Sequence, residues 1–210
     1  MALDNNTADR LLHAARHEFA AVGYERGSVR RICEAADANV SAVKYHFGSK
    51  GSLYRAVWRH TAQQMFASHP MPRLKPGDDP RAVLRELVVW FLHLVIDPTR
   101  VDPLSGPMLA HEAAGPTEDA LDIFAELCAK PICHEIRGIV CATTGLGRDT
   151  RAAETLTAAV VALCVTPQNA RELLTRVGAP PPTDPRAIRR MAHTLADFAL
   201  AGLDGFKEAR

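Results

Sequence analysis

The chain lacks the features of secreted, membrane-spanning and disulfide-stabilised proteins. Its 210 residues are 47% apolar and 23% charged, a composition typical of globular proteins and not of disordered ones. The longest uncharged stretch of the C-terminal half, 155–170, is too short to cross a bilayer and is interrupted by Pro167. No apolar region follows Met1, so we expect no secretory signal. Five cysteines without disulfide-type spacing indicate reduced thiols, and we expect a cytoplasmic protein with no membrane partner.

Motifs of catalytic chemistry are also missing. The sequence contains no Gly-rich phosphate loop, no Glu-x-x-His pair and no nucleophile elbow. Cys128, Cys133, His134 and Cys141 do not have the close spacing of a zinc site, so we expect no metal and no cofactor. A cysteine redox sensor stays open. We therefore expect no enzyme, with catalysis in a helical-bundle cavity as the alternative.

Charge is distributed unevenly along the chain. The net charge is only +1, yet residues 26–59 carry seven basic and two acidic side chains, and the remainder is net negative. A basic cluster on a nearly neutral chain favours an anionic partner for that segment alone. The alternative is a solvated basic face.

The hydrophobic pattern predicts an all-α fold. Strand-like alternation is absent, and glycine and proline fall between segments with three- and four-residue apolar periodicity. In the first 67 residues this pattern predicts four helices, over 8–22, 29–36, 39–47 and 50–67. The residues expected to cap them are Thr7, Ser28, Asn39 and Ser49. Gly23 and Gly48 are expected to end the first and third helices.

A proline-rich stretch, 69–80, predicts the connection between two domains, 1–67 and 68–210. Asp79 is expected to cap a helix over 80–96, with Pro80 at its first position. Further helical pieces are expected at about 104–114, 118–143, 150–165, 168–177 and 185–207. Pro131 is expected to kink or divide the second of these, and Pro167 to separate the third from the fourth.

The second and third helices, joined by a tight turn in the basic segment, have the outline of a helix-turn-helix. Val43 and Phe47 are four residues apart and are expected to be buried. The outward side chains are then Ser41, Ala42, Lys44 and Tyr45. Lys44 has the reach for guanine, and phosphate oxygens suit Tyr45, His46 and Lys50.

At this point the residues resemble the DNA-binding domain of the tetracycline-repressor (TetR) family. The resemblance covers about residues 8–58 and includes the run Val43 to Lys50, VKYHFGSK, together with Phe19-Ala20, Gly23-Tyr24 and Ser28-Val29-Arg30. The ending YHFGSK is most similar to a subgroup with a CecR-type C-terminal domain. Residues 117–122 and Pro131 are weakly similar to that domain.

The resemblance implies roles for individual residues. Phosphate contacts are implied for Ser28, Tyr45, His46 and Lys50. Groove-facing positions are implied for Arg30, Val40, Ser41, Ala42 and Lys44. Two residues depart from the family pattern: Asp37 occupies the place of the usual turn glycine, and Lys44 replaces an aromatic residue or asparagine. Asp37 must therefore adopt a left-handed conformation that favours glycine.

Each candidate has a structural alternative. Lys44, Lys50 and Arg30 could be ordinary surface side chains. Tyr45 could be a packing aromatic and His46 a core histidine. An adaptor whose N-terminal motif binds protein remains a further alternative, and the steep salt dependence of DNA binding separates the two.

The C-terminal two-thirds carries two unusually apolar segments. Residues 158–165 are apolar without interruption, and the last helix has a wide stripe of apolar and small residues from Ile188 to Phe206. They resemble the two helices that form the TetR-family dimer interface, with a monomer core as the alternative. A homodimer would present two recognition helices to a palindromic operator.

A helical domain of this size can hold a ligand between its helices. The candidate lining residues are Trp90, His93, Met108, His111, Phe124 and Cys128. Core packing is the alternative for each. The resemblance implies a repressor that releases DNA when a small-molecule effector selects another conformation.

Overall fold

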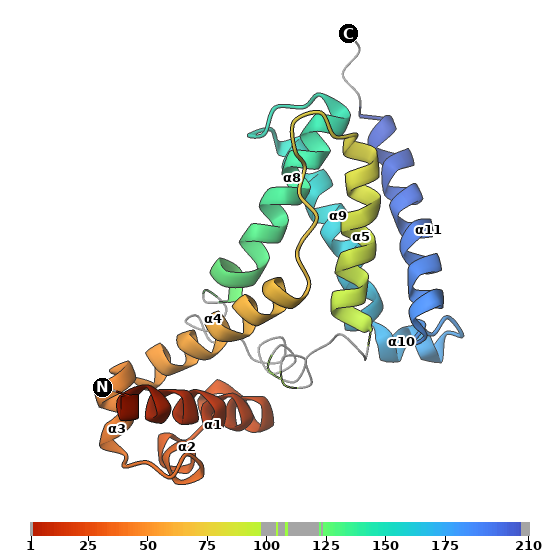
Figure 1. Ribbon diagram of the computed structural model, residues 1–210. Helices are drawn as coiled ribbons and strands as arrows, with labels where there is room; N and C mark the ends of the chain where they lie inside the picture. Colours follow the sequence, from red (N-terminus) through yellow and green to blue (C-terminus); the bar gives the residue numbers. More distant parts are fainter. Residues whose placement is uncertain (1, 98–103, 105–107, 109–121, 123, 207–210) are drawn as a thin grey trace. The chain divides into compact units, whose positions relative to one another are not determined.

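The computed structural model describes residues 2–97, 104, 108, 122 and 124–206 (Figure 1). Every regular element in these ranges is a helix, which confirms the all-α prediction. The chain forms two compact units. The first contains Met1–Ser68 and Asp102–Ala129, and the second contains His69–Val101 and Lys130–Arg210. The functional division into domains 1–67 and 68–210 stays a prediction.

The first unit contains α1 (Ala2–Arg26), α2 (Val29–Ala35), α3 (Ser41–Phe47), α4 (Lys50–Ser68) and the short π-helix η1 (Ala125–Ala129). Gly23 interrupts α1 with a left-handed φ of 76°, where the sequence predicts the end of the helix. Ser28 and Ser49 accept backbone N–H bonds from Arg31 and Ser52, as their predicted capping roles require.

Two predicted helix starts are wrong. The first helix begins at Ala2, so Thr7 lies within it and does not cap it. Residues 2–6 contain no glycine or proline that would stop a helix from extending toward the N-terminus. The third helix begins at Ser41, with Val40 at its N-cap. The Asn39 carboxamide still accepts the Ser41 N–H at 2.9 Å, because Asx side chains readily bond backbone two residues ahead.

The core of the first unit joins all its helices through large side chains. Leu11, Phe19, Ile32, Leu53 and Trp58 are fully buried or nearly so. The Phe19 and Tyr54 rings meet edge to face with centroids 4.8 Å apart. The later segment joins this core through Phe124, whose ring centroid lies 5.4 Å from that of Trp58, and through the buried Met108 and Cys128. These contacts fix α4, and with it the helix-turn-helix.

The second unit is a bundle of four longer helices and one short one. These are α5 (Pro80–Ile96), α8 (Lys130–Thr144), α9 (Arg151–Asn169), α10 (Arg171–Arg176) and α11 (Pro185–Asp204). In Figure 1, α5 and α11 run side by side. Two ion pairs link them, Arg81 to Asp204 at 2.6 Å and Arg85 to Asp197 at 3.0 Å. Asp79, Thr150 and Asp184 cap three of these helices through side-chain oxygens.

The two internal prolines behave differently. Pro131 lies at the start of α8, directly after η1, so it does divide the predicted 118–143 piece. Pro167 does not separate two helices, because α9 continues to Asn169. The fixed φ of Pro167 is compatible with a helix. Helical hydrogen bonding continues past the proline to the C-terminal end of α9, where the Ala170 N–H donates to the Thr166 carbonyl at 2.9 Å. No helix in the described ranges has the length and apolar content to cross a membrane.

Candidate nucleic-acid interface

Helix α3 presents two different faces. Val43 is 3% exposed and anchors the helix in the core of the first unit. The other face carries Ser41 and Lys44, both exposed, and Tyr45, 74% of whose surface is exposed. This short helix thus exposes an aromatic ring and a cation that has no partner among the described residues, and neither side chain is buried in the core of the unit. The arrangement suits a helix that inserts into a groove.

The flanks of α3 extend this surface. Val40, at the N-cap, is 54% exposed, and Ala42 is half-buried. His46 is half-buried, and its ring meets Tyr45 edge to face with centroids 4.9 Å apart. Because this contact restricts both rings, the Tyr45 hydroxyl is held on a partly ordered side chain that can reach a phosphate.

The start of α2 is held in place by Glu18 of α1. The Glu18 carboxylate accepts hydrogen bonds from the Ser28 backbone N–H at 2.9 Å and from Arg31 Nε at 2.8 Å. Arg31 also donates to the Arg26 carbonyl at 3.0 Å. The Arg31 hydrogen bond lowers the pKa of Glu18; partial burial opposes this, while the Ser28 N–H and the charges of Arg31 and Lys50 reinforce it. The network therefore fixes Ser28 relative to α1.

Lys50 lies at the first turn of α4 and bends back toward the end of α1. Its ammonium donates to the Glu25 carbonyl at 3.0 Å and lies 4.6 Å from the centre of the Tyr24 ring. Since Glu25 is only three residues from Ser28, Lys50 lies near the start of α2. Lys50 and Ser28 thus form a second cluster of potential phosphate contacts.

Two further residues carry charge at this surface. Arg30 is exposed and pairs with Glu34 one turn along α2, at 2.9 Å. Asp37 adopts the left-handed φ of 47° that the sequence predicts, and among the described non-glycine residues it is the one with positive φ. Its carbonyl accepts a hydrogen bond from Arg10 at 3.3 Å, which ties the turn to α1.

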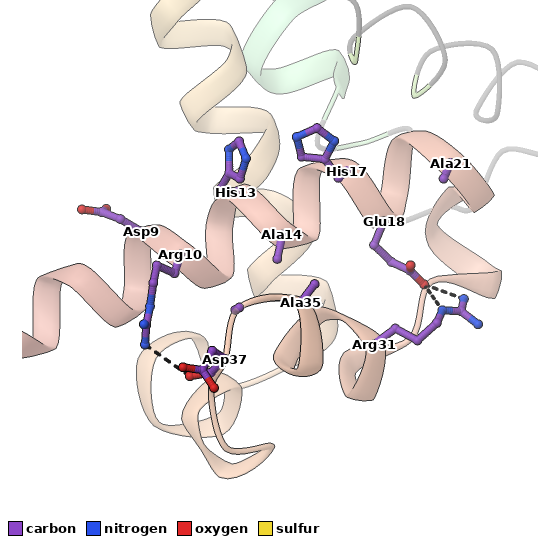
Figure 2. A pocket seen from close by; sticks show the side chains of 11 residues that line it. Asp9, Arg10, His13, Ala14, His17, Glu18, Ala21, Arg31, Ala35 and Asp37 are labelled. Atoms are coloured by element: carbon purple, nitrogen blue, oxygen red, sulfur yellow. Dashed lines mark hydrogen bonds and ion pairs between the residues drawn. The ribbon is translucent and has the colours of Figure 1, made fainter.

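An open groove of about 680 Å³ lies between α1 and α2 (Figure 2). The Glu18–Arg31 and Arg10–Asp37 contacts lie along it. The lining of the groove includes four alanines. Leu11, Phe19 and Ile32 pack α1 and α2 together in the core, and the polar bridges add ties between the same helices along the groove.

Several of these residues escaped the sequence analysis. Glu18 and Arg10 act through contacts that join distant parts of the chain, and neither charge nor periodicity indicates them. Tyr24 is part of the family resemblance, but nothing in the sequence indicates its contact with Lys50. The sequence also contains a His-x₃-His pair on α1, His13 and His17, whose ring centroids are 4.7 Å apart. That spacing is visible in the sequence. However, no group of three or more potential metal ligands comes together among the described residues.

The candidate effector residues fall in both units. Trp90 and His93 are buried in α5 of the second unit. Met108, Phe124 and Cys128 pack in the core of the first unit. His111 lies outside the described residues. Desolvation raises the pKa of the Cys128 thiol to about 11 and that of Cys164 to about 12, which disfavours reactive thiolates.

Two family models match the chain. The model of the bacterial regulatory proteins of the TetR family matches residues 11–57, which span α2 and α3. The model of the C-terminal domain of the transcriptional dual regulator CecR matches residues 80–203, more than half of the chain.

Curated relatives match over a shorter length. The transcriptional repressor AcnR of Corynebacterium glutamicum is 40% identical over 60 residues, which cover 29% of this chain and 32% of AcnR. AcnR of Corynebacterium efficiens matches with the same identity and coverage. The match thus spans about a third of the length of these relatives.

Solved structures match nearly the whole chain at low identity. A TetR-family regulator from Mesorhizobium loti has a TM-score of 0.63 at 17% identity, covering 95% of this chain and 97% of its own. A transcriptional regulator from a Rhodococcus species has a TM-score of 0.60 at 22% identity, covering 93% and 96%. The flavonoid-responsive regulator FrrA has a TM-score of 0.68 at 20% identity, covering 94% and 97%. These similarities establish the fold, and the two family models identify the protein: it belongs to the TetR family of DNA-binding transcriptional regulators, which are not enzymes, and it has a CecR-type C-terminal domain.

Proposed function

We propose that the protein is a cytoplasmic, ligand-responsive repressor that binds a palindromic operator as a homodimer through α3. The exposed Lys44 and Tyr45, on a helix anchored by the buried Val43, carry this proposal. Their face offers a cation for base edges or phosphates and an aromatic hydroxyl for the backbone. Arg30, Val40, Ser41 and Ala42 complete the groove-facing set. Ser28, His46 and Lys50 contact the phosphates on either side.

Repression is supported by AcnR, a transcriptional repressor that is 40% identical over 60 residues. A dimer bound across the operator would exclude other proteins from that DNA. Two recognition helices must reach major-groove sites about one helical turn, roughly 34 Å, apart, so the operator is an inverted repeat.

The homodimer is supported by apolar surface on the second unit. Phe198 of α11 is 69% exposed, and Phe206 is 51% exposed. Ala158, Ala159 and Ala162 are exposed on α9, although helices that are apolar all round are normally buried on every side. A second copy of the same surface would cover these side chains and place two helix-turn-helix units on one duplex.

Effector binding is supported by the fold and by one neighbour. FrrA, which shares the fold, is described as flavonoid-responsive. A small molecule would act here by binding one dimer conformation more tightly than the other. Its effect on DNA affinity would then be limited by that difference in binding free energy. All six effector candidates fall within residues 80–203, the CecR-type match, and Trp90 and His93 are the two that lie in the second unit.

The test is a mobility-shift titration with the full chain and DNA from upstream of its own gene. We expect Lys50→Ala and Tyr45→Ala to weaken binding at least tenfold. Lys75→Ala, which removes an exposed lysine from the connection between the units, is the matched control and should bind like the wild type. Equal affinity in all four proteins would overturn the proposed contacts.

Salt dependence separates DNA binding from the adaptor alternative. A protein that neutralises several phosphates loses affinity steeply as salt rises, since bound counterions are released. We expect the logarithm of the DNA affinity to fall linearly with the logarithm of salt concentration. A flat dependence would favour a protein partner for the N-terminal unit.

A further inference from the structure

Two histidines lie one turn apart on α1. His13 and His17 are both exposed and both line the groove between α1 and α2, and their ring centres are 4.7 Å apart. Figure 2 shows the two rings on the same side of α1, projecting in the same direction. Residues four apart on a helix lie one above the other, so their side chains can reach a common point. The two imidazoles are therefore placed to act together on one ligand.

The rings have no other contact that accounts for their position. Neither imidazole has a hydrogen-bond or ion-pair partner among the described residues, apart from the edge-to-face contact between the two rings. Neither histidine belongs to the hydrophobic core of the first unit. Exposed imidazole nitrogens without a protein partner are open to solvent and to metal ions, for which histidine is the commonest protein ligand.

The distance between the rings fits two imidazoles bound to one metal ion. Zinc–nitrogen bonds of about 2.0–2.1 Å place the centres of two coordinated rings roughly 4.5–5.5 Å apart, and the observed 4.7 Å lies in this range. Because both side chains are exposed, rotation about their side-chain bonds can turn one nitrogen of each ring toward the same ion. Zinc peptidases hold their metal with the same helical His-x₃-His spacing, but Ala14 takes the place of their glutamate, so the resemblance is to the ligands alone.

We propose that His13 and His17 form a surface site for one divalent late transition-metal ion, such as nickel, zinc or copper. No third histidine, cysteine, aspartate or glutamate joins them among the described residues, so water fills the other coordination positions. Two imidazoles suit these ions, whereas magnesium and calcium prefer oxygen ligands. The sequence-based expectation of no metal concerned the cysteines and His134 of the C-terminal half, which this site does not include.

The position of the site connects it to the helix-turn-helix. It lies between Arg10, which donates to the Asp37 carbonyl, and Glu18, which accepts the Ser28 N–H. A metal ion that joins successive turns of α1 binds the folded helix and not the unfolded chain, so it stabilises the segment that holds the turn and the start of α2. The site does not depend on the proposed repressor function, and a chain that bound nickel but no DNA would still contain it.

Calorimetric titration of the full-length, untagged protein with nickel chloride tests the proposal. The titration is made at pH 8, where imidazole nitrogens are largely free of protons. We expect His13→Ala and His17→Ala each to weaken the tightest nickel site at least about tenfold, because one remaining ligand cannot chelate. Both positions are exposed and alanine favours helix, so the variants should fold. His193→Ala, which removes an exposed histidine from α11, is the matched control and should bind nickel like the wild type. Equal binding by all four proteins would overturn the proposal.

Thermal melts give a second readout. Excess nickel chloride should raise the melting temperatures of the wild type and His193→Ala by at least about 2 °C and leave those of His13→Ala and His17→Ala unchanged. An equal rise in all four proteins, or none in the wild type, would overturn the proposal.

Side-chain NMR of the wild type gives a readout that needs no variant. We expect zinc chloride, and not magnesium chloride, to shift the imidazole resonances of His13 and His17 together as one ion binds. Movement of one ring alone, or of neither, would show that the two histidines do not share a metal ion.

Discussion

The ammonium of Lys50 lies 4.6 Å from the centre of the Tyr24 ring and donates to the Glu25 carbonyl at 3.0 Å. Lysine side chains on a surface usually sample many rotamers, and ordering one on binding costs entropy. Here the two contacts restrict the side chain before DNA arrives. The first turn of α4 therefore offers a positioned cation close to the start of α2, and its contribution to DNA binding can be measured.

Replacing Lys50 by alanine should weaken DNA binding at every sequence to a similar extent. Because a lysine on a phosphate displaces about one counterion, the salt dependence of the logarithm of affinity should become shallower by about 0.9. Lys50→Arg keeps the charge and is the control for the slope. Titrations at four or more salt concentrations give this value, and an unchanged slope for the alanine variant would place Lys50 away from phosphate.

Glu18 should couple stability to pH. Its pKa is lowered in the folded protein, chiefly by the hydrogen bond from Arg31. A depressed carboxyl pKa stabilises the fold above the unfolded-state value of about 4.3, and this stabilisation is lost as pH falls through the folded-state value. We expect Glu18→Gln to lower the melting temperature by roughly 2–4 °C at pH 7.

The difference between wild type and Glu18→Gln should then shrink once the pH drops below about 5 and continue to shrink as the wild-type carboxyl is protonated. Thermal melts across pH 3–7 measure this. Glu86→Gln, at an exposed position of α5, is the control and should show no such convergence. A difference that stays constant down to pH 3 would mean that the Glu18 charge does not stabilise the unit.

Local chemistry accounts for the elements that the sequence predicts well. Ser28, Ser49 and Asp79 cap helices because their side chains accept nearby N–H groups, an interaction contained within four residues. Val43 is buried because helical periodicity places it beside the core. The left-handed conformation of Asp37 is implied by the family resemblance, because Asp37 occupies the place of the usual turn glycine.

Contacts between distant residues account for what the sequence does not predict. The spacing of Glu18 and Ser28 carries no local signal, yet their hydrogen bond sets the start of α2. Lys50 was expected to point toward phosphate, and its contact with Tyr24 depends on how α1 packs against α4. The placement of Phe124 beside Trp58 is equally non-local. Pro167 shows that tertiary packing can hold a helix together through a residue of low helix propensity.

Replacing Asp37 by glycine should stabilise the folded protein. Asp37 has a φ of 47°, where a Cβ is disfavoured and glycine is not. Asp37→Gly should stabilise the protein by up to about 1 kcal/mol, since relief of strain exceeds the extra entropy of the unfolded chain. Removal of a negative charge near the recognition helix should also strengthen DNA binding at low salt.

Asp37→Ala separates these two effects. It removes the same charge but keeps a Cβ without aspartate's tolerance for this conformation, so it should be less stable than the wild type while binding DNA at low salt as tightly as the glycine variant. Urea denaturation and mobility shifts give the two quantities. A glycine variant no more stable than the alanine variant would show that backbone conformation at residue 37 costs little.

Phe198 should decide whether two copies associate. Its exposed ring lies on the apolar face of α11, and a glutamate there would place a charge in a self-complementary interface twice, once from each copy. We expect Phe198→Glu to shift the protein from dimer to monomer in light scattering coupled to size-exclusion chromatography. Binding to an inverted-repeat operator should weaken at least about a hundredfold, because each half-site is then bound alone.

Leu173→Glu is the matched control for this change. Leu173 is 63% exposed, as a large apolar side chain on α10 outside the α9 and α11 surface. The same substitution there adds an equal charge without touching the proposed interface, so the protein should remain dimeric and bind the operator normally. If both variants dissociate, the dimer extends over α10. If neither does, Phe198 is not in the interface, and the two recognition helices are joined through some other surface of the chain.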